Sequence, residues 1–333
     1  MAAQARRRPP RPPTPLPAAG GEAPPGPFGA AYLAAEAYAP QLEGELRRQG
    51  IAVAHWHGRL ALTREAPVPA AWSLDTWAAP VEAGIASIGA AADMLRAVQR
   101  NWALYAAAHH RRATLIAARL PPVKAAPLAF PAPPPGAHLG AWTLLAPDRL
   151  LWSAAKSSPF VNGEVRFVED REGPPSRAYL KLWEAMTRMG AWPGPGARCI
   201  DLGAAPGGWT WALARLGAEI VAVDRAPLDP RIAAMPGVTG RIGSAFVIAP
   251  EPRDWMVCDV AAYPDRLLRL AETWTAPGGA RRIVATMKFQ GETDFDAAAA
   301  LAAIPGGTVR HLFHNKHELT LMWTRPGVCP GAE

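Results

Sequence analysis

Cysteine is scarce in this 333-residue chain, and long apolar runs are missing from it. The three cysteines, Cys199, Cys258 and Cys329, are scattered, with no Cys-x-x-Cys pair and no neighbouring histidine at metal-ligand spacing. This pattern predicts a reducing compartment and no structural zinc. No stretch reaches the roughly 18 uncharged apolar residues of a membrane-spanning helix, and the N-terminus lacks the apolar core of a secretory signal. We therefore expect a soluble, cytoplasmic protein without a metal site.

Acidic residues are too few to balance the basic ones. The formal net charge is +7 and the isoelectric point is about 9.7. Such a balance suits a polyanionic partner such as nucleic acid, although an arginine-rich composition alone can also produce it. Hydrophobic residues make up 50% of the chain, and its length allows about two domains with a well-buried core.

The N-terminal half predicts an arm and a small α+β domain. Residues 1–27 combine proline, glycine and arginine with almost nothing to bury, so we expect a disordered arm, either touching phosphates or uninvolved. Residues 28–157 begin with a helical pattern from "YLAAEAYAPQ", followed by short strands in "IAVAHWHGRLALT" and a long alanine-rich helix over about residues 85–120. A proline-rich interruption and a hairpin, "AWTLLAPDRLLWSAA", follow. The linker to the next domain is expected around "KSSPFVNGEVRFVEDREGPP".

Residues 158–325 alternate strand and helix, and residues 326–333 form a short tail. The segments "RCIDLG", "EIVAVD", "DWMVCDV" and "RRIVATMK" read as strands with helices around them. This alternation predicts an α/β domain with a mostly parallel sheet, covered by helices on both faces. The last two strand segments, "TVRHLFH" and "ELTLMWT", are joined only by "NKH" and must therefore run antiparallel.

A glycine turn follows the first of these strands. The segment "CIDLGAAPGGWT" places Gly203, Gly207 and Gly208 around Pro206, where backbone amides can approach a ligand closely. The spacing is not Gly-x-Gly-x-x-Gly, so a dinucleotide site is the weaker interpretation. Asp224 ends the next strand, where its carboxylate can accept hydrogen bonds from ribose hydroxyls of NAD or of an adenosyl ligand alike.

The charge at this turn favours a cationic ligand. No Gly-x-x-x-x-Gly-Lys-Ser/Thr cradle occurs, and Asp201 stands where a pyrophosphate would be repelled. The sulfonium of S-adenosyl-L-methionine fits better, with an NAD-dependent oxidoreductase as the rival. A turn that merely connects strand to helix is a further alternative. It is disfavoured because Asp201, Asp224 and Asp259 all fall at strand ends, the edge where sheets of this kind bind ligands.

Four charged residues are placed unusually for a buried sheet. Lys288 ends "RRIVATMK" and Asp259 ends "DWMVCD", so both side chains should emerge at the edge that carries the glycine turn. Lys181 lies in an amphipathic helix, "SRAYLKLWEA", and Glu318 opens the last strand. Each charge alone would more often be a solvated or structural ion pair. Together with the glycine turn, the four favour a catalytic site.

These segments resemble the FtsJ-like ribose 2′-O-methyltransferases, and among them the RlmM branch that modifies large-subunit ribosomal RNA. The resemblance covers about residues 158–325 and rests on "SPFVNG", "PSRAYLKLWEA", "DLGAAPGGWT", "WMVCDV", "MKFQG" and "LFHNKHELTL". It implies a Rossmann-like methyltransferase sheet, mostly parallel with an antiparallel last strand, beside a smaller N-terminal α+β domain of THUMP-like type. In that domain only the first helix and the terminal hairpin match.

The resemblance also implies a catalytic tetrad of Lys181, Asp259, Lys288 and Glu318. A ribose hydroxyl is a poor nucleophile at neutral pH, so it must lose its proton as it attacks a methyl carbon in line with the sulfonium. In such enzymes Lys288 would be the base and Lys181 would orient the hydroxyl, with the two carboxylates fixing both lysines.

For the cofactor, the resemblance implies S-adenosyl-L-methionine. Its expected contacts come from Ser176, from the turn, from Asp224 beside the ribose and from Asp259 near the methionine end; the candidates on and around the turn are Asp201, Gly203, Ala205, Pro206, Gly207, Gly208 and Trp209. Relatives carry an acidic residue after the third strand for the adenine amine, whereas this chain has Ser244. A serine can accept a hydrogen bond, but an uncharged acceptor predicts a weaker contact.

The implied partner is RNA, with a cytidine of bacterial large-subunit ribosomal RNA as the target. Because a ribose is reachable only in an exposed nucleotide, we expect naked RNA or an early assembly precursor. Arg96, Arg100, Arg111 and Arg112, on or near the long helix, could contact phosphates or form a solvated face. The sequence does not fix the oligomeric state, for which a monomer is the expectation. A catalytically idle RNA-binding protein or cofactor sensor is the alternative function.

Overall fold

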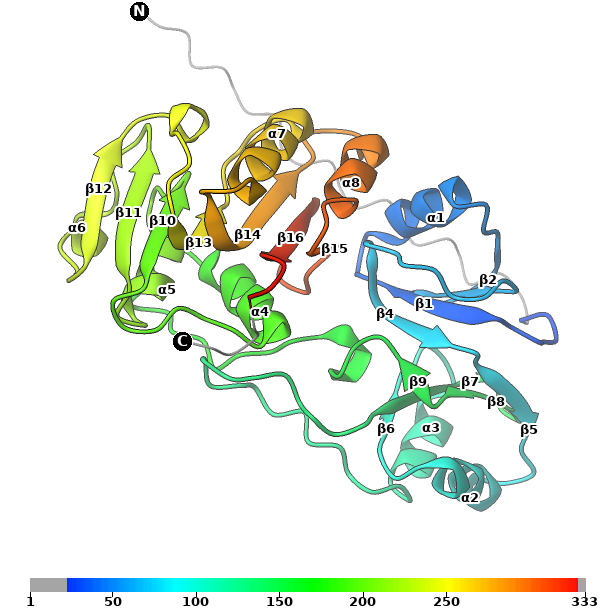
Figure 1. Cartoon of the computed structure of the whole chain (residues 1–333). Helices are drawn as coiled ribbons and strands as arrows, with labels where there is room; N and C mark the ends of the chain where they lie inside the picture. Colours follow the sequence, from blue (N-terminus) through cyan, green and yellow to red (C-terminus); the bar gives the residue numbers. More distant parts are fainter. Residues whose placement is uncertain (1–22, 329–333) are drawn as a thin grey trace, which may run out of the picture.

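The structure is a computed structural model that describes residues 23–328, and Figure 1 shows it as two packed domains. The C-terminal domain is built on a seven-stranded sheet in the order β12-β11-β10-β13-β14-β16-β15. Neighbouring strands from β12 to β14 pair in parallel, and β16 is antiparallel to both β14 and β15. The predicted mostly parallel sheet with an antiparallel last strand is confirmed. The strands are β10 (Arg198–Leu202), β11 (Glu219–Asp224), β12 (Val238–Ile242), β13 (Arg253–Cys258), β14 (Ala280–Lys288), β15 (Gly307–Arg310) and β16 (Glu318–Thr324).

Helices cover both faces of this sheet (Figure 1). Successive residues of a strand point to opposite faces, so Cys199 packs in the core under α4 and α5, while Ile200 packs under α7 and α8. Burial on both faces explains the continuous apolar runs in these strands. The helices are α4 (Tyr179–Met189), α5 (Gly208–Ala214), α6 (Pro230–Ala233), α7 (Pro264–Thr275) and α8 (Phe295–Ala302).

The N-terminal domain contains two smaller sheets, in the orders β2-β3-β1-β4-β9 and β5-β8-β7-β6. The predicted short strands are β2 and β3, and the predicted hairpin is β7 and β8. Its elements are β1 (Ala30–Ala34), α1 (Ala39–Arg48), β2 (Val53–His57), β3 (Leu60–Thr63), β4 (Ser73–Ala78), β5 (Val81–Gly84), α2 (Ile88–Val98), β6 (Trp102–Leu104), α3 (His110–Ala117), β7 (Gly140–Ala146), β8 (Arg149–Ser153) and β9 (Ala155–Lys156).

The long helix predicted over residues 85–120 is wrong. The chain leaves α2 at Gln99, which is extended, and β6 then pairs in parallel with β7 before α3 begins. The indole of Trp102 donates hydrogen bonds to the carbonyls of Leu95 and Gln99 and so closes the helix end. Alanine-rich composition favours a helix, but burial of Trp102 against a neighbouring strand overrides that propensity. The four arginines expected on one helix are thereby divided: Arg96 in α2, Arg100 after it, and Arg111 and Arg112 in α3.

Two further expectations need correction at the N-terminus. The segment "YLA", read as part of a helix, lies in β1, a strand paired on both sides, and the helix starts only at Ala39, with a proline in its first turn. The expected disordered arm includes residues 23–27, which instead pack on the domain: Arg149 donates to the carbonyls of Ala23 (2.6 Å) and Pro24 (3.2 Å). The rest of that arm, residues 1–22, lies outside the described residues, as do residues 329–333 with Cys329.

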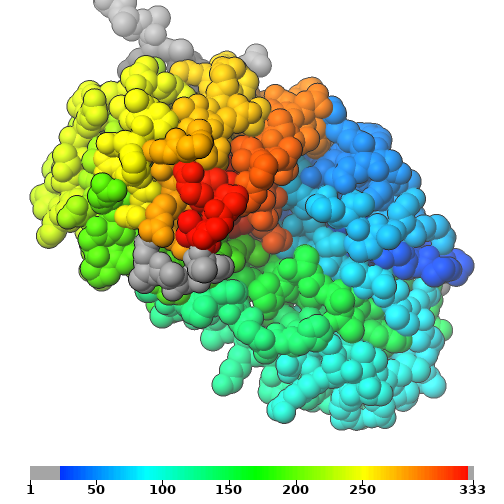
Figure 2. All heavy atoms as spheres, viewed as in Figure 1, coloured from blue at the N-terminus to red at the C-terminus, as the bar shows by residue number. Residues whose placement is uncertain are grey.

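The two domains share a packed interface. The ring of Trp72 lies 5.8 Å from that of Phe289 and 5.2 Å from that of His311, whose backbone amide donates to the carbonyl of Ala71. Figure 2 shows the blue and cyan N-terminal surface running directly against the orange surface of α8. Within residues 23–328, no helix has the length and apolar character needed to cross a membrane.

Candidate active site

The glycine turn lies at the carboxyl end of β10 and brings backbone close to its neighbours. Gly203 has φ +84°, and a Cβ there would stand 2.7 Å from Cβ of Val260. Gly207 has φ +117° and would meet Ile232 at 2.8 Å. Because residues with a Cβ atom rarely adopt such a positive φ, both positions require glycine. At Gly208, the first residue of α5, a Cβ would lie 2.8 Å from Oγ of Ser176.

Asp224 holds the turn in place from the end of β11. Its Oδ2 accepts a hydrogen bond from the amide of Ala205 (3.0 Å), and its Oδ1 accepts one from the amide of Ala226 (2.9 Å). The side chain is half-buried. Each carboxylate oxygen retains accepting capacity, so Asp224 can still receive hydrogen bonds from the hydroxyls of a bound sugar.

The tetrad predicted from the sequence is assembled in the structure. Nζ of Lys181 lies 2.7 Å from both carboxylate oxygens of Asp259 and 3.1 Å from Oε1 of Glu318. Nζ of Lys288 lies 3.1 Å from Oδ1 of Asp259 and donates to the backbone carbonyl of the same residue at 2.5 Å. Lys288 also faces Glu318 in the register of β14 and β16. Segments more than 100 residues apart in the sequence therefore meet at one edge of the sheet.

Known proteins are similar to this part of the chain. Residues 174–325 match the family of FtsJ-like methyltransferases. This region is similar to FtsJ-like methyltransferases. The ribosomal RNA large subunit methyltransferase M of Halorhodospira halophila is 37% identical over 156 residues, which are 44% of this chain and 46% of that protein. The protein of the same name from Laribacter hongkongensis is 38% identical over 170 residues, 46% of this chain and 48% of that protein. The chain spans about half the length of these curated relatives.

Solved structures resemble the C-terminal domain only distantly. The fibrillarin pre-rRNA processing protein of Methanococcus jannaschii aligns with a TM-score of 0.33 and 17% identity, over 44% of this chain and 75% of that chain. A likeness at this level does not indicate an activity.

The two lysines of the site have different surroundings. Burial alone would lower the pKa of Lys181, but the carboxylates of Asp259 and Glu318 outweigh it and hold that pKa above its ordinary value. Lys181 is therefore charged at neutral pH. Its side chain is 10% exposed, whereas that of Lys288 is 25% exposed and has one carboxylate contact. Lys288 is thus the more accessible of the two amines and the less tightly paired one.

Three of the expected cofactor residues already make hydrogen bonds within the domain. Asp201 is buried beneath the turn and accepts a hydrogen bond from Thr210 (2.6 Å); burial raises the pKa of its carboxyl to about 7. The indole of Trp209 is also buried and donates to the carbonyl of Ala178 (2.8 Å). Oγ of Ser244 accepts from the amide of Phe246 (3.3 Å). Asp201 and Trp209 therefore brace the turn, and the acceptor capacity of Ser244 is already partly used.

Glu184 is a site residue that the sequence interpretation missed. Its carboxylate, fully buried in α4, accepts hydrogen bonds from the amides of Phe313 (3.0 Å) and His314 (3.1 Å) and pairs with Arg188 (2.8 Å). It thereby fixes the loop that leads to Glu318. Glu184 comes three residues after Lys181 and therefore lies on the same side of the amphipathic helix. This spacing could have identified it from the sequence.

Among residues 23–328, no three histidine, cysteine, aspartate or glutamate side chains lie where they could hold a metal ion. The polar groups of the site are instead two lysines, several carboxylates and backbone amides. Such a set can bind an organic cation with hydroxyl groups and can hold or move a proton.

Proposed function

We propose that this protein is an S-adenosylmethionine-dependent RNA ribose 2′-O-methyltransferase, acting on a cytidine of bacterial large-subunit ribosomal RNA. The observation that carries the proposal is the pair of lysines joined through Asp259 beside the glycine turn. The ribosomal RNA methyltransferases that match this chain support the substrate class. The N-terminal domain, as a THUMP-like module, would bind the RNA.

The residues present suit S-adenosylmethionine. The backbone of the turn at Gly203 and Gly207 packs closely against Val260 and Ile232, and Asp224 beside it would offer carboxylate oxygens to the ribose hydroxyls. Asp259 places negative charge at the same edge, near the cationic end of the cofactor. When bound, the cofactor supplies an electrophilic methyl group on a sulfonium. Ser244, in place of an acidic residue, would contact the adenine without charge assistance.

Each member of the tetrad has a role that its contacts support. Lys181 is charged and fixed by two carboxylates, so it would donate a hydrogen bond to the attacking ribose oxygen and orient it. Lys288, more exposed and less tightly paired, would in its neutral amine form accept the hydroxyl proton at Nζ as the methyl carbon is attacked. Asp259 holds both amines, and Glu318 balances the charge of Lys181.

Replacing the proposed base tests this mechanism. Lys288→Ala should lower turnover roughly 10²- to 10⁴-fold, the usual share of a general base, while cofactor affinity measured by calorimetry stays within about threefold. The assay is transfer of tritium from labelled S-adenosylmethionine to ribosomal RNA transcripts. Lys288→Arg introduces a guanidinium that stays charged and cannot accept a proton at neutral pH, so it should also be inactive. Near-normal transfer by Lys288→Ala would remove this residue from the mechanism.

The target is tested in cells. Mapping ribose methylation in ribosomal RNA with and without the gene should show one cytidine that loses its methyl group. In vitro, naked RNA or an early assembly precursor should be a better acceptor than mature ribosomes, because a folded ribosome hides the ribose. Absence of transfer by the unmodified protein to any RNA would favour the catalytically idle alternative.

A further inference from the structure

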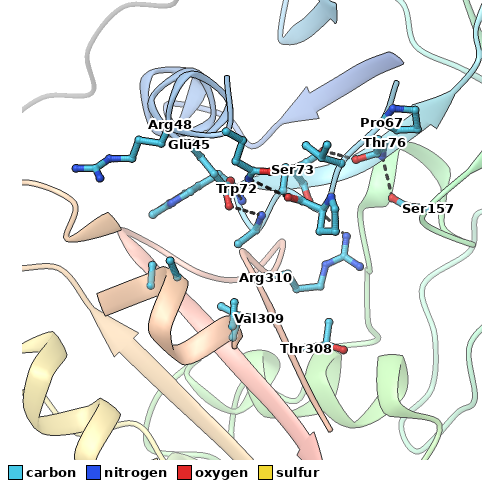
Figure 3. Close-up of a pocket in the computed structure, with 18 of the residues that line it drawn as sticks. Glu45, Arg48, Pro67, Trp72, Ser73, Thr76, Ser157, Thr308, Val309 and Arg310 are labelled. Atoms are coloured by element: carbon cyan, nitrogen blue, oxygen red, sulfur yellow. Dashed lines mark hydrogen bonds between the residues drawn. The ribbon is translucent and has the colours of Figure 1, made fainter. Parts of the chain in front are cut away.

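Two cavities in the described part of the chain lie away from the tetrad. They differ in whether the charged side chains on their walls are paired. The larger, about 830 Å³, lies between α1, α8 and β15 (Figure 3). Lys156 on its wall pairs with Asp75 at 2.8 Å, Arg48 pairs with Asp296 at 2.8 Å, and Glu45 accepts from two backbone amides. The Arg48–Asp296 pair joins the two domains, and the other contacts hold the N-terminal domain, so these side chains are already engaged.

The second cavity, about 630 Å³, has cations without such partners. It lies between the end of α2, residues 122–139 and residues 159–166. In the part of the chain from residue 23 to 328, neither Arg100 nor Lys124 takes part in an ion pair. The acidic wall residue Glu164 is held between Arg59 (3.4 Å) and Arg166 (2.7 Å). The basic residues of the wall are Arg100, Lys124, His138 and Arg166, and the larger apolar ones are Leu128, Leu139, Phe160 and Val161.

The wall of this cavity is held by hydrogen bonds and does not depend on a ligand for its shape. The amide of Leu128 donates to the carbonyl of Arg166 (2.8 Å), and the amide of Val168 donates back to the carbonyl of Leu128 (2.9 Å). On the opposite side, the side-chain amide of Asn101 donates to the carbonyl of His138 (3.2 Å). A preformed site loses little conformational entropy when a ligand binds.

Two contacts connect the cavity to the tetrad. The guanidinium of Arg166 lies over the ring of Phe313, 5.4 Å from its centroid. Phe313 begins the loop that runs to β16, where the amide of Lys316 donates to Oε1 of Glu318 (3.2 Å). Arg166 of the cavity wall therefore contacts the start of the loop that carries Glu318 of the tetrad.

We propose that this cavity binds a single-stranded segment of the substrate RNA that flanks the methylated ribose. The unpaired cations suit phosphates, and the apolar wall with Phe313 offers surfaces on which bases pack, the combination by which proteins hold single strands. The inference rests on the proposed function only in taking RNA as the acceptor. Positioning of the RNA would then come from a site separate from the chemistry.

Binding measurements on the full chain test the site. The probe is a fluorescein-labelled ten-nucleotide oligocytidylate RNA, followed by anisotropy at several salt concentrations. Arg100→Gln combined with Lys124→Gln should weaken binding about tenfold at low salt and reduce the slope of log affinity against log salt by about 1.4, since each lost phosphate contact on a single strand contributes about 0.7. The same RNA annealed into a duplex should be little affected by the substitutions.

The matched control removes the same charge elsewhere. Arg47→Gln combined with Arg269→Gln changes two exposed helix residues in α1 and α7, outside the cavity and the tetrad, and should change the affinity less than about twofold. Equal weakening by both pairs would show a diffuse charge effect and would overturn the site, as would unchanged binding by the first pair. Because the readout is binding, it stands even if methyl transfer fails, and the two proposals can fall separately.

Discussion

Lys181 and Lys288 show how one residue type acquires two roles from its surroundings. Lys181 is enclosed by two carboxylates that keep it charged, whereas Lys288 shares only Asp259 and is more open to solvent. Sequence spacing could place both at one edge of the sheet. It could not say which amine is enclosed, because that depends on Glu318 arriving from a strand that pairs out of chain order.

At the same scale, Asp201 predicts how the stability of the protein changes with pH. Its pKa is raised to about 7 by burial, while an unfolded aspartate ionises near 4. Between these values the folded state keeps a proton that the unfolded state has lost, so stability falls as pH rises through this window. Asp201→Asn cannot ionise and should remove this loss. The difference in unfolding free energy between variant and parent should grow by about 3 kcal/mol from pH 5 to pH 8, at about 1.4 kcal/mol per unit.

Urea unfolding at the two pH values measures this difference. The control is Asp265→Asn, which changes an exposed carboxylate paired with Arg269 on α7 and should show no comparable change with pH. If the unfolding free energies of Asp201→Asn and of the parent protein changed equally with pH, the idea of a protonated, buried Asp201 would be contradicted.

At the scale of elements, the buried apolar strands of the C-terminal sheet and the strands β2, β3, β7 and β8 were predicted from the sequence, whereas β1 and β6 were not. The strands β10, β11, β13 and β14 carry apolar runs with an acidic or basic residue at or next to the strand end (Asp201, Asp224, Asp259 and Lys288), and all lie where the sequence placed them. β1 and β6 are alanine-rich and short, so their composition suggests a helix. They form strands because they pair with strands from elsewhere in the sequence, β1 with β3 and β4 and β6 with β7, and a local pattern does not contain this information.

The glycine turn is the element on which the site depends, and Gly203→Ala should damage it. The new Cβ would meet both Cα (2.8 Å) and Cβ (2.7 Å) of Val260, next to Asp259, in a backbone region with φ +84°. We expect a loss of roughly 2 kcal/mol or more in unfolding free energy, from the left-handed conformation and the clash, together with weaker cofactor binding. Urea unfolding and calorimetric titration with S-adenosylmethionine measure the two effects.

Gly194→Ala is the matched control for this change. Gly194 is outside the positive-φ glycines, and a Cβ there would meet nothing within 4 Å. It should leave stability within about 1 kcal/mol of the parent, or raise it slightly. If both alanines had the same small effect, the turn would tolerate a side chain and its role as a close cradle would be wrong.

At the scale of the whole molecule, the sequence indicated two domains but not how they join. The joint is made by rings far apart in the chain, with Trp72 from the N-terminal domain against Phe289 and His311. The sequence around Trp72 and the sequence around Phe289 and His311 contain no pattern that predicts this contact. The cavity proposed for RNA was likewise hidden, because its walls come from three separate segments, one of them the proline-rich stretch that lacked any predicted element.

The buried pair of Asp75 and Lys156 is expected to hold this joint, since Lys156 ends the last N-terminal strand and also donates to the carbonyls of Ser158 and Phe160 in the linker. Their side chains are 0% and 2% exposed. Asp75→Asn leaves a buried ammonium without a charge partner, which should cost about 3 to 5 kcal/mol. Adding Lys156→Met removes that unpaired charge, so the double variant should be more stable than the summed losses by at least about 1 kcal/mol.

Urea unfolding of the two single variants and the double variant gives this coupling energy directly. The exposed pair Asp265 and Arg269, at 2.7 Å, provides the comparison, because solvent screens such pairs and their coupling should stay below about 1 kcal/mol. A coupling at the buried pair no larger than at the exposed one would mean that the linker is held by packing and backbone hydrogen bonds alone. One wall segment of the proposed RNA cavity begins at Pro159, three residues after Lys156. The shape of the cavity would then not depend on this charge pair.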